Sequence, residues 1–196
     1  DVNVADMDND GDLDIVSASA TDDTIAWYEN DGAANPSWTA ADIATSADYA
    51  HGVHVGDMDG DGDLDIVSAS SADGTIAWYE NDGNANPSWA AADIATNATQ
   101  ATDVYLADMD GDGDLDIISA SAGDDTIAWY ENNGAADPAW SAVDIAITAD
   151  VAIDLHVADM DGDGDLDILS ASQGDDTIAW YENQGSRPSL SINDVT

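Results

Sequence analysis

The chain has 196 residues, and 43 acidic residues against one basic residue, Arg187, give it a formal charge of −42. This charge argues against nucleic acid and anionic membrane surfaces as partners, and without an apolar run of roughly 18 residues we expect no membrane insertion. The chain contains no cysteine, so disulfides cannot contribute to its stability. It opens directly in a repeat without a signal-peptide pattern, so we expect a mature protein or a fragment of a longer one.

Each repeat is predicted to begin with a short strand, Val53 to Val55 in the second repeat, that runs into an acidic loop. The four loops begin at Asp6, Asp57, Asp108 and Asp159, so each starts 51 residues after the last. The first loop reads DMDNDGDLD, and the other three read DMDGDGDLD. Five carboxylates within nine residues repel one another unless a cation lies between them.

The spacing of these carboxylates predicts calcium. Hard divalent cations take about six to eight oxygen ligands, and alternate residues of a tight loop can point to a common centre. Magnesium prefers to keep its waters, and softer metals would require His or Cys. Loop positions 1, 3, 5 and 9 are expected to supply side-chain oxygens, and position 7 a backbone carbonyl. We therefore expect one Ca²⁺ in each loop, or about four in the chain.

Two alternatives to a calcium loop are disfavoured. Solvated acidic turns are also rich in Asp and Gly, but four copies in register argue against that interpretation. An EF-hand needs a Glu at position 12, where these loops have Ser17, Ser68, Ser119 and Ser170. The residues assigned to metal binding are Asp6, Asp8, Asp10, Asp12, Asp14, Asp57, Asp59, Asp61, Asp63, Asp65, Asp108, Asp110, Asp112, Asp114, Asp116, Asp159, Asp161, Asp163, Asp165 and Asp167.

The rest of each repeat is predicted to supply three more strands. In the second repeat these are Asp65 to Ser70, Thr75 to Glu80 and a fourth segment that contains Trp89. An Asn-Asp-Gly hairpin signal at 81–83 precedes the fourth segment. That segment is a strand or, because Pro87 suits the first turn of a helix, a short helix.

Repeats of about 51 residues with four strands each predict an all-β, β-propeller-like array of four blades. We assign repeat 1 to residues 1–49, repeat 2 to 50–100, repeat 3 to 101–151 and repeat 4 to 152–196. Ser189 to Thr196 either completes a degenerate last strand or begins another domain, because SLSINDVT resembles the opening of a Calx-beta domain. The blades either close into a four-blade ring or form part of a larger ring or assembly.

The DxDxDGxxD loop before a DIVSAS strand, followed by IAWYEND, resembles the FG-GAP and VCBS repeats of integrin α-subunit propellers and of many secreted bacterial proteins. The resemblance covers nearly the whole chain. The Phe-Gly and Gly-Ala-Pro signatures are absent and the chain has no Phe, which places it nearer the VCBS branch. Members usually close with more blades than are present here, which implies that another chain or further sequence completes the ring.

Candidate ligand residues other than the loop aspartates lie at the repeat junctions. Tyr49, His51 and His54 cluster at one junction, and His54, Tyr105 and His156 hold equivalent places in successive repeats. They alternate with apolar neighbours, so they are expected to line a central channel if the first strand is innermost. They either hold a ligand or fill a narrow tunnel, and filling is favoured. The recurring Trp-Tyr pairs are expected to pack between blades.

These features predict a secreted or cell-surface, calcium-stabilised β-propeller with a structural or adhesive, non-catalytic role. The chain has no Cys, no Lys and no Gly-x-Ser-x-Gly motif to support catalysis. The expected partners are an extracellular glycan or protein, or copies of the chain itself. The alternatives are a self-assembling fibre subunit, a lectin-like carbohydrate-binding module and a non-catalytic domain of a larger secreted enzyme. Asn97 begins an Asn-Ala-Thr sequon and is a candidate glycosylation site.

Overall fold

The computed structural model describes residues 1–185 and the backbone of residues 191–194. The described residues form sixteen strands and no helix, as the repeat pattern predicts. They therefore include no helix long and apolar enough to cross a membrane. The strands make four antiparallel sheets, here called blades 1 to 4, and within each blade the four strands lie side by side in chain order.

Each blade uses the same four strands in the same order. Blade 1 consists of β1 (Val2–Ala5), β2 (Asp14–Ser19), β3 (Thr24–Asn30) and β4 (Trp38–Ala44). Blade 2 consists of β5 (Ala50–Gly56), β6 (Asp65–Ser70), β7 (Thr75–Asn81) and β8 (Trp89–Ala95). Blade 3 consists of β9 (Ala101–Ala107), β10 (Asp116–Ser121), β11 (Thr126–Asn132) and β12 (Trp140–Ala146). Blade 4 consists of β13 (Ala152–Ala158), β14 (Asp167–Ser172), β15 (Thr177–Glu182) and β16 (Ser191–Asp194).

The fourth segment of each repeat is a strand, so the helix alternative is wrong. In blade 2, β8 pairs antiparallel with β7, and Trp89 lies opposite Asn81. Gly83 has a φ of 67°, which lets the chain turn back toward the edge of β7. The Asp82 carboxylate closes the connection by accepting the Ser88 N–H at 3.1 Å. This turn positions the segment to add to the sheet, which outweighs the helix-start signal of its proline.

The last strand, β16, pairs antiparallel with β15, as β4, β8 and β12 pair with the third strands of their blades. Tyr181 on β15 lies opposite Ile192. The expected segment Ser189 to Thr196 therefore contributes a fourth strand to this sheet. Its residues 189–190 and 195–196 lie outside the described residues.

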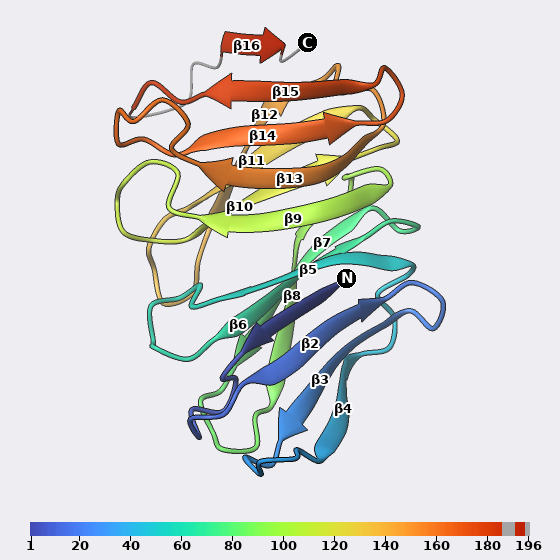
Figure 1. Ribbon diagram of the computed structural model, residues 1–196, viewed down its shortest axis with the longest axis vertical. Helices are drawn as coiled ribbons and strands as arrows, with labels where there is room; N and C mark the ends of the chain where they lie inside the picture. Colours follow the sequence, from blue (N-terminus) through green and yellow to red (C-terminus); the bar gives the residue numbers. More distant parts are fainter. Residues whose placement is uncertain (186–190, 195–196) are drawn as a thin grey trace.

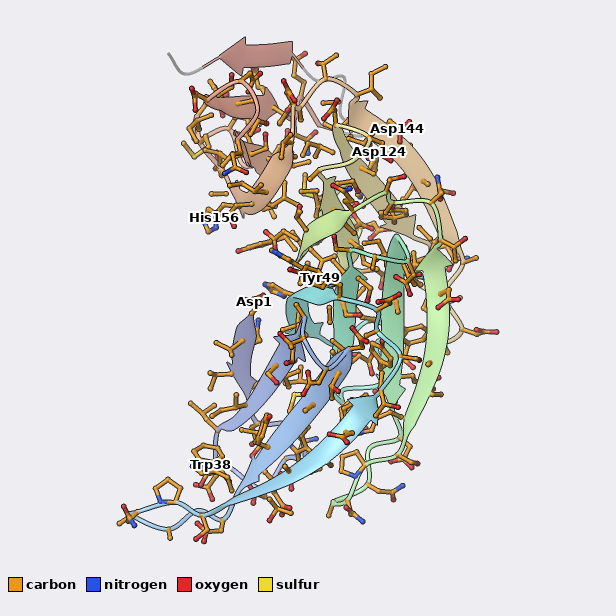
Figure 2. The ribbon with its side chains drawn as sticks, turned by 90° about the vertical axis from the view of Figure 1, so that its right-hand side faces the viewer. Asp1, Trp38, Tyr49, Asp124, Asp144 and His156 are labelled. Carbon is orange, nitrogen blue, oxygen red and sulfur yellow. The ribbon has the colours of Figure 1, made fainter. Side chains whose placement is uncertain are left out.

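The four blades follow one another along the long axis of the molecule, with blade 1 at one end and blade 4 at the other (Figure 1). The first strand of each blade is innermost, because β1 lies beside β5, β5 beside β9 and β9 beside β13. In Figure 2 the fourth strands β4, β8 and β12 lie on the outer, convex side. The sequence left open whether the blades close into a four-blade ring or form part of a larger ring or assembly. The described residues form an open arc, which suits the second arrangement (Figure 1, Figure 2).

The hydrophobic core lies between blades. Between blades 1 and 2, Met7, Ile25 and Trp27 of blade 1 pack with Ile66 and Tyr79 of blade 2.

Each blade has two faces. We call the face that contacts the following blade the tail face and the face that contacts the preceding blade the head face. The tail faces present the equivalent residues Met7, Val16, Ile25 and Trp27; Met58, Val67, Ile76 and Trp78; and Met109, Ile118, Ile127 and Trp129. The head faces present Val53, Ile66 and Tyr79; Val104, Ile117 and Tyr130; and Leu155, Ile168 and Tyr181.

The Trp-Tyr pair in each third strand explains why both faces of a blade are apolar. Trp78 and Tyr79 are adjacent on β7, so they point to opposite faces of the sheet. Trp78 lies on the tail face toward blade 3, and Tyr79 lies on the head face toward blade 1. Both side chains are buried. The expectation that these aromatic residues pack between blades is confirmed.

Candidate metal centres

Each acidic loop connects the innermost strand of a blade to its second strand. In each loop, three Asp side chains offer oxygen atoms that all lie within 4.8 Å of one another. The sets are Asp6, Asp8 and Asp10; Asp57, Asp59 and Asp61; Asp108, Asp110 and Asp112; and Asp159, Asp161 and Asp167. Positions 1 and 3 belong to every set. The third member is position 5 in the first three loops and position 9 in the fourth.

The backbone of each loop turns its N–H groups toward these carboxylates. In the second loop, Asp57 accepts the N–H of Gly60 at 2.9 Å and that of Gly62 at 3.1 Å. Asp59 accepts the N–H of Asp61 at 3.1 Å. Gly62 has a φ of 98°, which a side chain would strain, so a glycine at position 6 suits this turn. The loop thus orients its own acidic side chains toward one centre.

Position 9 is the buried end of each loop. Asp65 accepts the N–H of Met58 at 3.1 Å and the N–H of Asn81 at 2.8 Å. Burial raises the pKa of Asp65 to about 7 and that of its equivalent, Asp116, to about 6. No Lys or Arg lies among the described residues to offset these charges, because the sequence has only Arg187. A donor set made only of oxygens, with an uncompensated carboxylate at its base, fits a hard divalent cation.

Position 3 carries a similar electrostatic cost. Burial, with a further contribution from neighbouring loop carboxylates, raises the pKa of Asp8, Asp59 and Asp110. These residues belong to the clusters in which the ligand oxygens converge. A cation at the centre would oppose both effects, because it favours the ionised carboxylates.

The aspartate side chain at position 7 does not belong to the converging cluster of its loop. A Cβ added to Gly83, in the turn between β7 and β8, would overlap the Asp63 carboxylate, so this side chain lies over the turn. Asp63 also accepts a hydrogen bond from the Asn9 side chain of the first loop at 2.8 Å. That position 7 would offer a metal ion its backbone carbonyl stays a prediction. The side chains of Asp12, Asp114 and Asp165 lie over equivalent turn glycines.

In blades 2 to 4, an asparagine at or just after the end of the third strand ties the blade to the metal loop of the preceding blade. The Asn81 side chain donates to the Met7 carbonyl of the first loop at 3.0 Å and to the Leu64 carbonyl of its own loop at 3.0 Å. Asn132 and Asn183 bond in the same way to the Met58 and Met109 carbonyls, each at 2.8 Å. Sequence reasoning used this asparagine only as a turn former. Its recurrence after every TIAWYE segment was the signal that could have identified it.

A tryptophan lies beneath the second and third loops. The indole N–H of Trp78 lies near the Asp65 carboxylate and favours its ionised form, and Trp129 has the same relation to Asp116. Neither indole N–H meets the geometry of a regular hydrogen bond, although both are buried. The buried ends of these two loops therefore rest on side chains that also form the core between blades.

The inner strands carry a row of aromatic side chains. The rings of His54 and Tyr105 have centroids 4.8 Å apart, and those of Tyr105 and His156 are 5.5 Å apart and edge-on. The three residues come from β5, β9 and β13, as their 51-residue spacing predicts. Burial lowers the pKa of His54, whose Nδ1 has no hydrogen-bond partner among the described residues. This row is a candidate binding surface on the inner side of the arc.

Tyr49, His51 and His54 are close in sequence, but the structure gives each of them different surroundings. The His51 Nδ1 lies 2.8 Å from the Thr102 carbonyl of blade 3, whereas the His54 ring lies against the Tyr105 ring, tilted by 45°. Tyr49 occupies a turn with a φ of 58°, and its side chain is exposed. Ligand binding by these residues stays a prediction.

Asn97, the candidate glycosylation site, is exposed in the turn that follows β8. Its carbonyl lies 3.5 Å from the Thr99 hydroxyl of the same sequon. The position is accessible, and its glycosylation stays a prediction.

Comparison with known proteins agrees with the repeat pattern. The profile of the family described as FG-GAP-like repeat matches residues 6–68, 57–119 and 108–170. A solved structure of an Agrocybe aegerita lectin that recognises non-reducing terminal N-acetylglucosamine has a similar fold, with a TM-score of 0.65 and 20% sequence identity. The match covers 98% of this chain but 51% of the lectin chain, so the chain spans about half the length of that lectin. No curated protein sequence matches the chain.

Proposed function

The chain belongs to the FG-GAP-like repeat family, and from this premise we propose that it is a calcium-stabilised, non-catalytic β-propeller with a structural or adhesive role outside the cell. The observation that carries the proposal is the convergence of carboxylate oxygens in all four loops. The chain is highly acidic beyond these loops, which suits a secreted surface or a high-salt setting. Extracellular calcium modules bind at about 10⁻⁴ to 10⁻³ M, a concentration range that extracellular fluids reach.

The proposed ligands in each loop are the side chains at positions 1, 3, 5 and 9 and the backbone carbonyl at position 7. Calcium supplies positive charge where the chain has only carboxylates. Ions that bind only the folded state at 100 times their dissociation constant add roughly 2.7 kcal/mol for each independent site. Because each of the first three loops is tied to the next blade by an asparagine, the stabilisation at these loops reaches two blades.

Several features support a non-catalytic role. The sequence lacks Cys and Lys, which removes two common nucleophiles. The carboxylates that come closest together in the loops are already assigned to the proposed ions.

Calorimetry and thermal unfolding on the same sample test this proposal. We expect about four ions per chain and a large fall in melting temperature in excess chelator. Asp61→Ala should lower the stoichiometry by about one ion, whereas Asp144→Ala, which removes an exposed acid of β12 outside the loops, should leave it unchanged. An unchanged stoichiometry in Asp61→Ala, or a melting temperature insensitive to chelator, would contradict the proposal.

A carbohydrate ligand is a second candidate, and the row of His54, Tyr105 and His156 favours it. Aromatic and hydrogen-bonding side chains together suit the apolar faces and hydroxyl groups of a sugar. The lectin with a similar fold is consistent with this idea. A glycan array should show binding that Tyr105→Ala reduces without changing calcium stoichiometry. The absence of any bound glycan, or equal binding by the variant, would contradict the carbohydrate proposal.

A further inference from the structure

Two blade faces in the arc have no neighbour among the described residues: the head face of blade 1 and the tail face of blade 4. On the head face, Val2 is 65% exposed, while its equivalents Val53 and Val104 are each 2% exposed. On the tail face, Ile178 is 46% exposed, while its equivalent Ile127 is fully buried. Apolar surface of this kind marks a contact site. The two ends therefore expose one half each of the contact that the arc uses three times internally.

Hydrogen bonds that join neighbouring blades inside the arc lack one partner at each of its two ends. Asn30 of blade 1 donates to the Leu13 carbonyl of its own loop at 2.9 Å, and its side chain makes no second bond of the kind that Asn81 makes to a preceding blade. Asp103 of blade 3 accepts the Leu155 N–H of blade 4 at 2.8 Å. Its equivalent on blade 4 is the exposed Asp154. Each end thus offers one partner of a hydrogen bond that the interior completes.

We propose that the head face of blade 1 binds the tail face of blade 4 of a second copy of this chain. A second copy is the occupant that fits, because its tail face carries the residues that every internal head face contacts. Met160 would enter the place that Met7, Met58 and Met109 hold inside the arc, and Ile178 that of Ile25, Ile76 and Ile127. The Met160 carbonyl would accept from Asn30, and Asp154 from the Val2 N–H.

Two such contacts made together close a ring of two chains. Each chain contributes four blades, so the ring has eight, which lies within the range of about 4 to 8 blades that propellers use. The chain of the lectin with a similar fold is about twice as long as this chain. Closure uses the same heterologous contact twice, so it requires no surface beyond the two uncovered faces.

Charge opposes this association and makes it dependent on ions. Each copy carries a formal charge of −42, so two copies repel one another in dilute buffer. Salt screens such repulsion, with a Debye length of about 10 Å at 0.1 M. Association should therefore strengthen as salt rises, and calcium bound to the loops should strengthen it further.

Light scattering coupled to size-exclusion chromatography tests the contact in high salt and saturating calcium. We expect a mass of twice the 20.2 kDa of one chain. Val2→Asp at the head face or Ile178→Asp at the tail face should weaken association by more than about tenfold, because each would bury a carboxylate in an apolar contact. Ile147→Asp is the matched control, since Ile147 is 67% exposed in the turn after β12 and belongs to neither face.

Mixing the two variants gives the sharper result. The head variant keeps an intact tail and the tail variant keeps an intact head, so an equal mixture should form a heterodimer through one remaining contact. A wild-type chain that stays monomeric, or two variants that do not complement each other, would overturn the proposal. A ladder of longer oligomers would overturn closure at two chains. Thermal melting of the same samples with and without calcium tests the calcium proposal separately. A chain that calcium stabilises but that stays monomeric would overturn only the proposed contact between copies.

Discussion

β2 and β6 contain the same six residues, DIVSAS, yet they are buried differently. All six residues of β6 are buried, whereas burial in β2 alternates along the strand. The alternation leaves Ile15 and Ser17 partly exposed, and these residues point to the head face that has no neighbour. Identical local sequence therefore gives different burial, and the neighbouring blade makes the difference.

β14, in the last blade, also alternates between buried and partly exposed residues, but its exposed side is the tail face. Its residues Ile168 and Ser170 are buried against blade 3, while Leu169 and Ala171 on the tail face are partly exposed. A propeller strand has two apolar faces, so a strand at either end of the arc has one of them uncovered. The contrast between the inner blades 2 and 3 and the end blades 1 and 4 can be tested by matched substitutions in equivalent residues.

The largest contrast should come from the isoleucine at the second position of each TIAWYE segment. Ile127→Ala creates a cavity between blades 3 and 4 and should lower the free energy of unfolding by about 2–5 kcal/mol. Ile178→Ala removes a half-exposed side chain and should cost less than about 1 kcal/mol. Urea unfolding at concentrations that keep the chain monomeric measures both. Equal losses would mean that the end blade is packed as tightly as the inner one.

The asparagine ties should give the next contrast. Asn132→Ala leaves the Met58 and Leu115 carbonyls without their side-chain donor and should cost about 2–3 kcal/mol. Asn30→Ala removes one exposed donor bond and should cost about 1 kcal/mol less than Asn132→Ala. Both variants also lose the bond that the asparagine accepts from the turn glycine two residues later. Thermal unfolding in saturating calcium compares the two. A larger loss in Asn30→Ala would show that the tie between blades adds little.

A smaller effect is expected where two inner strands approach closely. A Cβ added to Gly52 would lie 2.9 Å from the Asp103 Cα of the next blade, so Gly52→Ala should cost about 1–3 kcal/mol. Asp154→Ala alters the equivalent position of blade 4, where no blade follows, and should cost less than about 0.5 kcal/mol. Melting temperatures of the monomeric variants measure this difference. A neutral Gly52→Ala would mean that β5 and β9 can separate at little cost.

The smallest effect depends on pH. Burial, and next the charge of Asp154, raises the pKa of Asp103 to about 7, above the value near 3.9 of an unfolded aspartate. The folded state therefore binds the proton more readily, and its stability falls as pH rises from about 4 through 7. Asp103→Asn stays neutral, so the free energy of unfolding of wild type should fall relative to this variant by about 1 kcal/mol as pH rises from 6 to 8. A difference that does not change across this range would contradict the prediction.

Much of the fold could be predicted because each repeat carries its own local signals. The loops, the Asx-Gly turns and the alternating strands all act within one 51-residue unit, so the sequence predicted the four-stranded blades that the structure shows. The start and end of β6 agree with the predicted strand Asp65 to Ser70. The fourth strand was ambiguous, because a proline that suits a helix start also suits a loop before an edge strand.

Other features depend on contacts between units and were not visible in one repeat. The second bond of Asn81 reaches a carbonyl in the preceding blade, so its role appears only when two blades are placed together. The separation of His51 from His54 depends on the path of β9 beside β5. The choice between a closed four-blade ring and part of a larger ring or assembly also stayed open, because curvature accumulates from small rotations between blades that no short motif encodes.

The asparagine ties have a consequence for how such a chain can change in length. Each of the three bonds from Asn81, Asn132 and Asn183 joins residues 74 positions apart. Duplication or deletion of one whole 51-residue unit by recombination would recreate this spacing, whereas an insertion of one residue within a unit would disrupt it. Genes for such arcs can therefore gain or lose complete blades in single events while every joint between blades remains intact.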